Sequence, residues 1–177
     1  MFGPPGRGDR IARRLLLPLL AIFLLVTSVF YVFFRHLSVE GDSMQPTLHD
    51  GDRVLITRPY QEPAAGDIVI VRAKPSEDRG ERELIKRVVA VEGDVVIVER
   101  GVAYVNGERE NGIHERFTDE NDISALELVI PEGHVYILGD NRPVSYDSRF
   151  YGPAPVGAIS GKVVAVYSPL TRIGRID

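Results

Sequence analysis

The chain has 177 residues, enough for one globular domain with a hydrophobic core and too few for two large domains. It contains no cysteine, which excludes disulfides, thiolate catalysis and cysteine-ligated metal sites. Of its 21 basic and 25 acidic residues, five arginines and one aspartate lie in residues 1–37, which leaves 16 basic and 24 acidic residues for the rest. This acidic remainder argues against nucleic acid as a partner, because nucleic acids bind basic surfaces.

Residues 15–34, LLLPLLAIFLLVTSVFYVFF, predict a transmembrane helix. Twenty uncharged residues span roughly 30 Å as a helix, which is the thickness of a bilayer core. Four arginines precede the run, so the positive-inside rule predicts a cytoplasmic basic tail (1–14) and an extracytoplasmic domain (35–177). The alternative is a cleavable secretory signal, but its apolar region is usually about 7–15 residues and ends in a small-x-small site. This run ends in FYVFFRH.

The chain after residue 38 predicts a mostly β, antiparallel domain. Short runs rich in β-branched and apolar residues are bounded by Gly, Pro and Asp, and Asn106-Gly107 is a hairpin-turn signal. Two stretches lack this pattern: residues 73–83 are expected to form an exposed loop, and residues 108–125 a peripheral insertion. The predicted strands are residues 53–57, 67–72, 84–93, 94–100, 102–106, 126–131, 134–140 and 159–167.

The stretch EGDSMQPTLHDGD, residues 40–52, contains a candidate nucleophile, Ser43. A serine hydroxyl needs a base within hydrogen-bond reach and donors for the developing oxyanion. The usual base is histidine, but none of the four histidines carries a specific signal. They lie at the membrane edge, in a turn, in the predicted insertion and at a strand start: His36, His49, His114 and His134.

The alternative base is a neutral lysine. The unperturbed pKa of lysine is about 10.4, and burial among apolar groups lowers it. Of the three lysines, Lys74 lies in a charged loop and Lys162 near the end of the chain. Lys86 lies in ELIKRVVAV, where strand alternation places it on one face with Leu84, Val88 and Ala90. It is therefore either at a sheet edge, with its amine in water, or desolvated for a chemical purpose.

A third stretch, residues 138–164, begins LGDNRPVSYDSRFYG and is rich in Asp, Asn, Arg, Ser and Gly. Such a loop can brace a site through buried hydrogen bonds and an Asp–Arg pair. On composition alone, a well-capped turn without a chemical role is the simpler interpretation.

Together these stretches resemble the bacterial type I signal peptidase (leader peptidase) family, membrane-bound serine proteases with a Ser–Lys dyad. The matching motifs follow an N-terminal anchor in order: GDSMxPTL at 41–48, GDIV at 66–69, IKRVVAxEGD at 85–94 and GDNRxxSxDSRxxG at 139–152. GDSx alone is common by chance, whereas four motifs in order are specific. The resemblance implies a coiled, antiparallel β-sheet catalytic domain.

The resemblance also implies roles for individual residues. Ser43 would be the nucleophile and Lys86 the general base, and Ser145 would support the lysine amine. Residues matching the supporting positions are Asp140, Asp147, Arg149 and Arg87; those matching the pocket for small substrate side chains are Met44, Leu48 and Ile85.

Two positions depart from the motifs of many members. Some members carry a hydroxyl residue two positions before the nucleophile, as an oxyanion donor, where this chain has Gly41. The oxyanion would then depend on the backbone N–H of Ser43, and Gly41→Ser is expected to be tolerated or helpful. Pro143-Val144 stands where many members have polar residues. The proline is expected to stiffen the loop that carries Ser145, which makes the match of Ser145 to the family position less close than that of the other motif residues.

The expected function is removal of signal peptides from secreted preproteins after small-x-small sites, through an acyl-enzyme and without a metal or cofactor. The expected location is the plasma membrane. Expected partners are preprotein signal peptides, the lipid bilayer and the secretion translocon, and no nucleic acid. Two alternatives stay open: a processing peptidase with narrow substrates, of the pilin-transfer or organellar type, and an inactive membrane-tethered scaffold.

Overall fold

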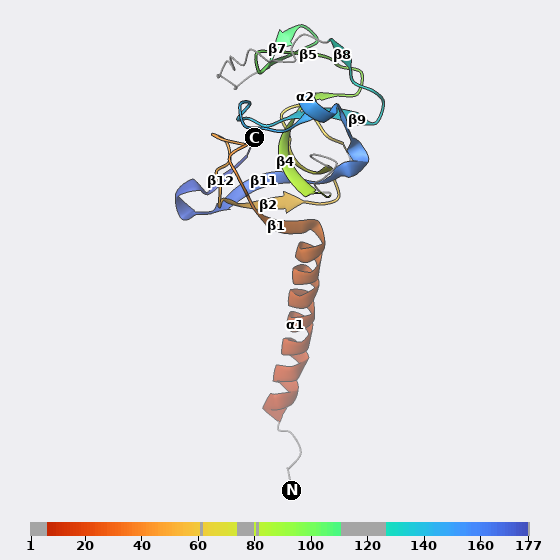
Figure 1. Ribbon diagram of the computed structural model, residues 1–177. Helices are drawn as coiled ribbons and strands as arrows, with labels where there is room; N and C mark the ends of the chain where they lie inside the picture. The colour runs from red at the N-terminus through yellow and green to blue at the C-terminus, as the bar shows by residue number, and fades with distance from the viewer. Residues whose placement is uncertain (1–6, 61, 74–79, 81, 111–126, 177) are drawn as a thin grey trace.

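The computed structural model describes residues 7–60, 62–73, 80, 82–110 and 127–176, as one long helix joined to a domain of antiparallel strands (Figure 1). The helices are α1 (Arg7–Phe33) and the short α2 (Ser148–Tyr151), with 3-10 turns η1 (Val156–Ala158) and η2 (Leu170–Arg172). The strands are β1 (Phe34–Ser38), β2 (Arg53–Thr57), β3 (Ile68–Ala73), β4 (Arg82–Val91), β5 (Val95–Glu99), β6 (Val102–Val105), β7 (Glu108–Arg109), β8 (Leu128–Val129), β9 (His134–Leu138), β10 (Ala154–Pro155), β11 (Ile159–Ser168) and β12 (Gly174–Arg175). The predicted fold class is confirmed.

Helix α1 has the length and composition of a membrane span. Its segment Arg14–Phe33 has a mean hydropathy of 2.6 and is not buried against the rest of the protein. Thr27 donates its hydroxyl to the carbonyl of Phe23 (2.7 Å), which satisfies this polar group within the helix. The helix begins earlier than the predicted span and ends one residue sooner, because Phe34 already pairs with Thr57 in the sheet.

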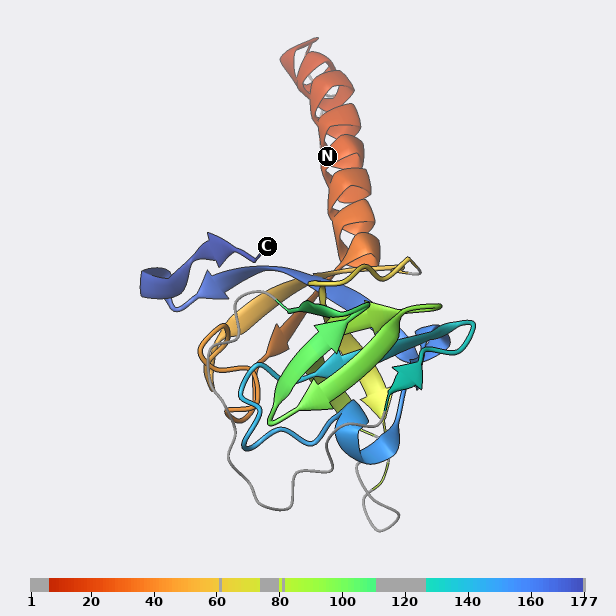
Figure 2. The same ribbon diagram turned by 90° about the horizontal axis from the view of Figure 1, so that it is seen from above.

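The first sheet has the strand order β1-β2-β11-β3-β4-β9-β10, and β12 pairs with β11. Figures 1 and 2 show α1 leaving the domain beside β1, and β11 with β12 extending to one side. Strand β9 pairs with β4 only from Arg87 onward, so the segment 82–86 of β4 pairs with β3 alone. Since β1 pairs only with β2, both β1 and this segment of β4 have an open backbone edge within the described structure.

The second sheet has the order β7-β6-β5-β8 and lies at the end of the domain away from α1 (Figure 1). A buried apolar cluster joins the two sheets. Its buried members are Val89, Ala90, Tyr136 and Leu138 from the first sheet, with Val96, Val98, Ala103 and Ile130. Burying one such large aliphatic side chain contributes about 1.5–3 kcal/mol.

Three sequence expectations change in detail. The predicted strand 126–131 is reduced to Leu128–Val129. A register shift between Val88 and Ala90 places Ala90 in the cluster between the sheets, so it does not share the environment of Lys86. Most of the predicted insertion, 111–125, lies outside the described residues; its start, Glu108–Arg109, forms the exposed edge strand β7, which pairs with β6.

Candidate active site

Ser43 lies in the turn between β1 and β2. Backbone hydrogen bonds from Val39 N–H to Asp52 O (2.8 Å) and from Gly51 N–H to Val39 O (3.0 Å) close this turn. Met44 and Leu48 anchor it in the core, at 1% and 0% exposed. Ser43 itself stays half-buried, and no described residue accepts a hydrogen bond from its backbone N–H. That N–H is therefore available to an oxyanion, as expected where Gly41 replaces a hydroxyl donor.

Lys86 meets Ser43 from strand β4. Its Nζ lies 2.9 Å from the Oγ of Ser43, and the lysine is only 3% exposed. Burial lowers the pKa of Lys86 from 10.5 to about 8, because desolvation disfavours the ammonium. The charge of Arg149 lowers this pKa further, while Asp147 and Asp140 raise it. A serine hydroxyl beside an amine that loses its proton near neutral pH is the geometry of nucleophile and base.

The loop 139–145 holds the serine turn in place. Asn141 donates its backbone N–H to the carbonyl of Ser43 (3.0 Å) and its side-chain amide to the carbonyl of Asp42 (3.0 Å). Gly139 permits this close approach, because a Cβ there would lie 2.5 Å from the carbonyl oxygen of Ser43. The motif at 139–152 therefore contacts the motif at 41–48, because Asn141 bonds to the backbone of Asp42 and Ser43.

Asp140 and Arg87 form a bidentate ion pair beneath the site. Arg87 Nε and Nη2 each lie 2.8 Å from a carboxylate oxygen of Asp140, whose side chain is fully buried. Thr47 donates its hydroxyl to the same carboxylate (2.5 Å). Because Arg87 follows Lys86 on β4 and Thr47 belongs to the serine turn, this ion pair ties together the three segments that carry the site.

Asp147 and Arg149 brace the other end of the loop. The fully buried Asp147 carboxylate accepts hydrogen bonds from Gly139 N–H (3.0 Å) and from Arg149 Nε (2.8 Å), and it caps α2. Arg149 Nη2 donates to the carbonyls of Arg142 (2.7 Å) and Ser145 (3.0 Å). Both residues thus fix the loop backbone, and they lie close enough to shift the pKa of Lys86 in opposite directions.

Ser145, expected to support the Lys86 amine, lies buried beside the serine turn. It is 4% exposed, and a Cβ on Gly139 would lie 2.2 Å from its Oγ and 2.5 Å from the carbonyl of Ser43. Its hydroxyl has no hydrogen-bond partner among the described residues. Ser145 is therefore adjacent to the serine turn, and its support of the Lys86 amine stays a prediction.

A groove of about 210 Å³ leads to the pair. It lies between residues 37–40 and residues 83–86, with Ser43 and Lys86 among its lining residues. Of the predicted pocket residues, Met44 and Ile85 line this groove. Leu48 does not; it lies behind them in the core cluster that contains Met44 and against which Ile85 packs.

Sequence reasoning missed a buried ion pair that connects the site loop to the second sheet. Arg142 is 1% exposed, and it donates to the carbonyl of Gly139 (2.8 Å), to the carbonyl of Gly101 and to both carboxylate oxygens of Glu110 (2.5 and 2.6 Å). Arg142 lies inside a quoted motif, which was a usable signal. Glu110 had none, because it lies near the start of residues 108–125, a stretch without strand pattern.

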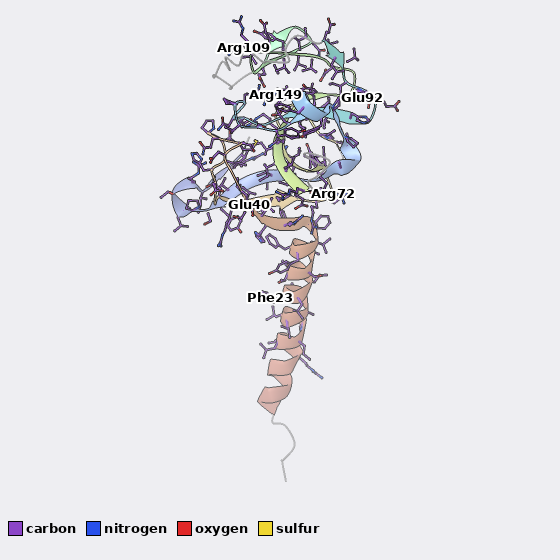
Figure 3. The ribbon with its side chains drawn as sticks, in the orientation of Figure 1. Phe23, Glu40, Arg72, Glu92, Arg109 and Arg149 are labelled. Atoms are coloured by element: carbon purple, nitrogen blue, oxygen red, sulfur yellow. The ribbon has the colours of Figure 1, made fainter. Side chains whose placement is uncertain are left out.

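The other basic candidates are not placed at the serine. Among the described histidines, His36, His49 and His134, none hydrogen-bonds to Ser43. Lys162 pairs with Asp67, and Lys74 and His114 lie outside the described residues. Figure 3 shows Arg149 in the middle of the β domain, Glu92 at about the same level, and Arg109 toward the end that is far from α1.

The signal peptidase model, peptidase S26, matches residues 12–168 of this chain. The chain therefore belongs to the signal peptidase family, as its motifs and its paired serine and lysine indicate. The match includes most of the apolar helix and nearly the whole β domain. Family membership and the apolar helix together indicate a membrane-anchored serine endopeptidase.

Relatives from bacteria and from organelles are similar in sequence. The chain is 32% identical to signal peptidase I of Bacillus licheniformis, over 81% of this chain and 82% of that protein. It is 37% identical to the mitochondrial ATP-independent inner membrane protease subunit 1b of Arabidopsis thaliana, over 87% and 80%. It is 36% identical to thylakoidal processing peptidase 1 of the same plant, over 77% of this chain but 42% of that protein.

A solved signal peptidase I from Enterococcus faecalis V583 is 25% identical, with a TM-score of 0.44, over 59% of this chain and 98% of the other.

Proposed function

We propose that this protein is a membrane-anchored endopeptidase that removes signal peptides from preproteins after small-x-small sites, with Ser43 as nucleophile and Lys86 as general base. The observation that carries this proposal is the 2.9 Å contact between Lys86 Nζ and Ser43 Oγ, with the lysine 3% exposed. Similarity to signal peptidase I from a bacterium, and to organellar processing peptidases, supports the substrate class.

The chemistry follows from the contact. Neutral Lys86 accepts the proton of Ser43 while the serine oxygen attacks the scissile carbonyl, and the backbone N–H of Ser43 donates to the developing oxyanion. The Lys86 ammonium returns its proton to the leaving amine, which frees the mature protein and leaves an acyl-enzyme on Ser43. Neutral Lys86 then takes a proton from water as the water oxygen attacks the ester; the ammonium returns this proton to the leaving Oγ of Ser43, which releases the signal peptide and restores the enzyme.

Substrate binding uses the two open strand edges. Strand β1 and the segment 82–86 of β4 face the groove, and each lacks a hydrogen-bonded neighbour on one side within the described structure. An extended peptide between them adds a strand, which reads backbone regardless of sequence. Met44 and Ile85 limit the space at Ser43 and favour a small side chain there.

The helix places this chemistry at a membrane surface. Ser43 follows the end of α1 at Phe33 by ten residues, so a fully extended link reaches at most about 36 Å. By the positive-inside rule, Arg7, Arg10, Arg13 and Arg14 place the N-terminus in the cytoplasm and the β domain outside a plasma membrane. The bilayer, emerging signal peptides and the secretion translocon are the proposed partners.

The test is cleavage of a preprotein with an Ala-x-Ala site in detergent micelles, with the N-terminus of the product sequenced. Wild type and Ser28→Ala, a control in α1, are expected to cut after the second alanine, whereas Ser43→Ala and Lys86→Ala lose the activity. Folded wild type that cuts no such preprotein would contradict the proposed substrate class. Cleavage that survives Ser43→Ala would contradict the proposed nucleophile.

A further inference from the structure

A pocket of about 830 Å³ lies where α1 meets the β domain. Its lining includes Tyr31 and Val32 from the last turn of α1, Arg58 and Tyr60 from the segment after β2, and Gly157 from η1. The groove that leads to the serine shares no lining residue with this pocket, so the two are separate. The proposed peptidase chemistry therefore leaves this pocket without a role.

The pocket lies at the level of the lipid headgroups of a membrane that α1 spans. The apolar segment Arg14–Phe33 has 20 residues, which as a helix cover about 30 Å, the thickness of the hydrocarbon core. Tyr31 and Val32 are among its last three residues, within about 5 Å of its end. The β domain follows directly from this end of α1 (Figure 1). A ligand in this pocket would therefore lie in the headgroup layer on the side of the β domain.

Two contacts fix Arg58 beside the end of the helix. Its backbone N–H donates to the carbonyl of Phe33 (2.8 Å), the last residue of α1. A Cβ on Gly161 of β11 would lie 3.4 Å from Arg58 Cγ, so the stem of the arginine packs closely against that strand. The arginine is therefore held in place by backbone and packing contacts, independently of any partner for its charge.

The guanidinium of Arg58 has no partner within the described structure. Its Nε is buried and has no hydrogen-bond partner. None of the ion pairs between described residues includes Arg58. A guanidinium stays charged and carries five N–H donors, and a phosphate accepts from it through two oxygens at once. Because buried polar groups are normally hydrogen-bonded, the unpaired guanidinium indicates an anionic ligand.

Asp67 does not supply that anion. Tyr60, which lines the pocket, donates its hydroxyl to the Asp67 carboxylate. The same carboxylate forms an ion pair with Lys162 and accepts the backbone N–H of Ala64 (3.0 Å). The charge of Asp67 is thus balanced by a lysine rather than by Arg58.

Arginines outnumber carboxylates near the other side of the pocket. Ser160, a lining residue, has its hydroxyl 3.4 Å from Glu83, whose carboxylate pairs with Arg35 (2.7 and 2.8 Å). Arg72 is the register partner of Glu83, and Figure 3 shows it on the side of the domain next to α1. Among these described residues, Arg35, Arg58 and Arg72 thus accompany a single carboxylate. Such an excess of basic side chains at a membrane surface attracts anionic lipids.

We propose that this pocket binds the headgroup of an anionic phospholipid from the leaflet on the side of the β domain, with the Arg58 guanidinium paired to its phosphate. Val32 and Ile159, which also line the pocket, provide apolar surface for the start of the acyl chains. The bound lipid ties the β domain to the bilayer at the end of α1. This inference needs the membrane span but not the peptidase activity, so it goes beyond the proposed function.

The test is the Tm of the full chain in neutral detergent micelles, titrated with one of three probes. The probes are dioleoyl phosphatidylglycerol, dioleoyl phosphatidylcholine and sodium phosphate, at equal ionic strength. A ligand that binds only the folded state raises Tm, and the dependence on its concentration gives an apparent Kd. Phosphatidylglycerol is expected to raise the Tm of wild type with an apparent Kd at least about tenfold below that of phosphatidylcholine. Sodium phosphate is expected to leave Tm unchanged.

Arg58→Gln removes the charge and keeps part of the stem, and is expected to weaken phosphatidylglycerol binding by about tenfold or more. Arg53→Gln is the matched control, because it removes the same charge from the same side of the chain's strand β2. Arg53 is exposed, does not line the pocket and lies four residues from Thr57, which is about 13 Å along a strand. This control is expected to bind phosphatidylglycerol like wild type.

Gly157→Glu keeps the arginine and decides the matter if Arg58→Gln does not fold. A Cβ on Gly157 meets nothing within 4 Å, so a side chain fits at this lining position. Its carboxylate competes with the lipid phosphate for Arg58. The rise of Tm with phosphatidylglycerol is therefore expected to be lost in this variant.

Wild-type binding of phosphatidylglycerol by both Arg58→Gln and Gly157→Glu would overturn this inference. Equal losses in Arg58→Gln and Arg53→Gln would also overturn it, since they would indicate attraction to net charge alone. An equal response to phosphatidylcholine would exclude an anionic headgroup, and an equal response to sodium phosphate would assign the pocket to free phosphate instead of lipid. Cleavage of a preprotein by the same proteins is a separate measurement, so each of these results would leave the proposed function intact.

Discussion

Lys86 and Ser43 are 43 positions apart in the chain, and their functional atoms lie 2.9 Å apart. The contact exists because a strand interior and a turn are held together by a shared loop, through Asn141 N–H to Ser43 O and through Asp140 to Arg87. Burying the lysine in this way lowers the free energy of unfolding. A buried amine that must lose its proton for catalysis destabilises the fold whenever it is charged.

The first prediction is that Lys86→Met abolishes activity but raises stability. The folded-state pKa of Lys86, about 8, lies below its unfolded value of 10.5. The unfolded chain therefore holds more protons between pH 8 and 10.5, and wild type gains stability as pH rises through that window. Removing the amine stabilises the protein at pH 7 by at most about 3 kcal/mol.

Thermal unfolding in detergent at pH 7 and pH 10.5 measures this. The difference in Tm between Lys86→Met and wild type is expected to be larger at pH 7 and to shrink at pH 10.5. A variant less stable than wild type at pH 7 would show that Lys86 contributes more through packing and hydrogen bonding than its charge costs.

The second prediction concerns the ion pair beneath the site. Asp140→Ala leaves the Arg87 guanidinium, 18% exposed, without its carboxylate, and is expected to destabilise the fold by about 3 kcal/mol. Arg87→Lys keeps a charge but loses the bidentate geometry, so it is expected to lose less stability than Asp140→Ala. Chemical denaturation of wild type and the two variants gives the order of their free energies of unfolding. Equal stability of Asp140→Ala and wild type would argue that the ion pair contributes nothing to the fold.

The third prediction concerns the link to the second sheet. Glu110→Ala leaves the charge of Arg142, a fully buried side chain, without its partner and is expected to cost roughly 3 kcal/mol. Activity is expected to fall as well, since Arg142 also donates to Gly139 in the site loop. Glu99→Ala, an exposed glutamate of the same sheet, is the control and is expected to change stability by less than about 0.5 kcal/mol. Matching stabilities for the two variants would exclude a structural role for the Glu110–Arg142 pair.

The fourth prediction contrasts two glycines of the motifs. A Cβ on Gly139 would lie within 2.5 Å of the Ser43 carbonyl and of Ser145, so Gly139→Ala is expected to displace the loop and remove most activity. A Cβ on Gly41 meets nothing within 4 Å, but the φ of +81° costs a side chain about 1 kcal/mol. Gly41→Ser is therefore expected to stay active with a modest loss of Tm. If Gly41→Ser is inactive but still unfolds cooperatively, the absence of a steric clash at this position is not sufficient for activity.

Much of this arrangement follows from the sequence because it is local. The strand patterns predict seven strands close to their observed positions, and the uncharged run predicts the helix. The motifs single out Ser43, Lys86, Asp140, Asp147 and Arg149, which the structure brings together at one site. Residues within one motif keep their spacing in any fold, so a motif carries information about them.

The remainder depends on contacts between distant segments. Nothing near Glu110 in the sequence indicates that it binds Arg142, because the pairing requires the second sheet to pack over the site loop. Leu48 matches a pocket position in the motif, yet the turn directs it into the core. The hydroxyl of Ser145 has no described partner, which motif spacing alone could not reveal.

The pH dependence of kcat/KM, measured for a preprotein cleaved by the full chain in micelles, directly tests whether Lys86 acts as the general base. If Lys86 must be neutral, the rate rises with pH to a plateau above about 8 and falls about tenfold per pH unit below that pKa. This profile would establish a base with the lowered pKa that burial imposes on Lys86. A rate that stays flat from pH 8 down to pH 6 would contradict the Ser43–Lys86 mechanism.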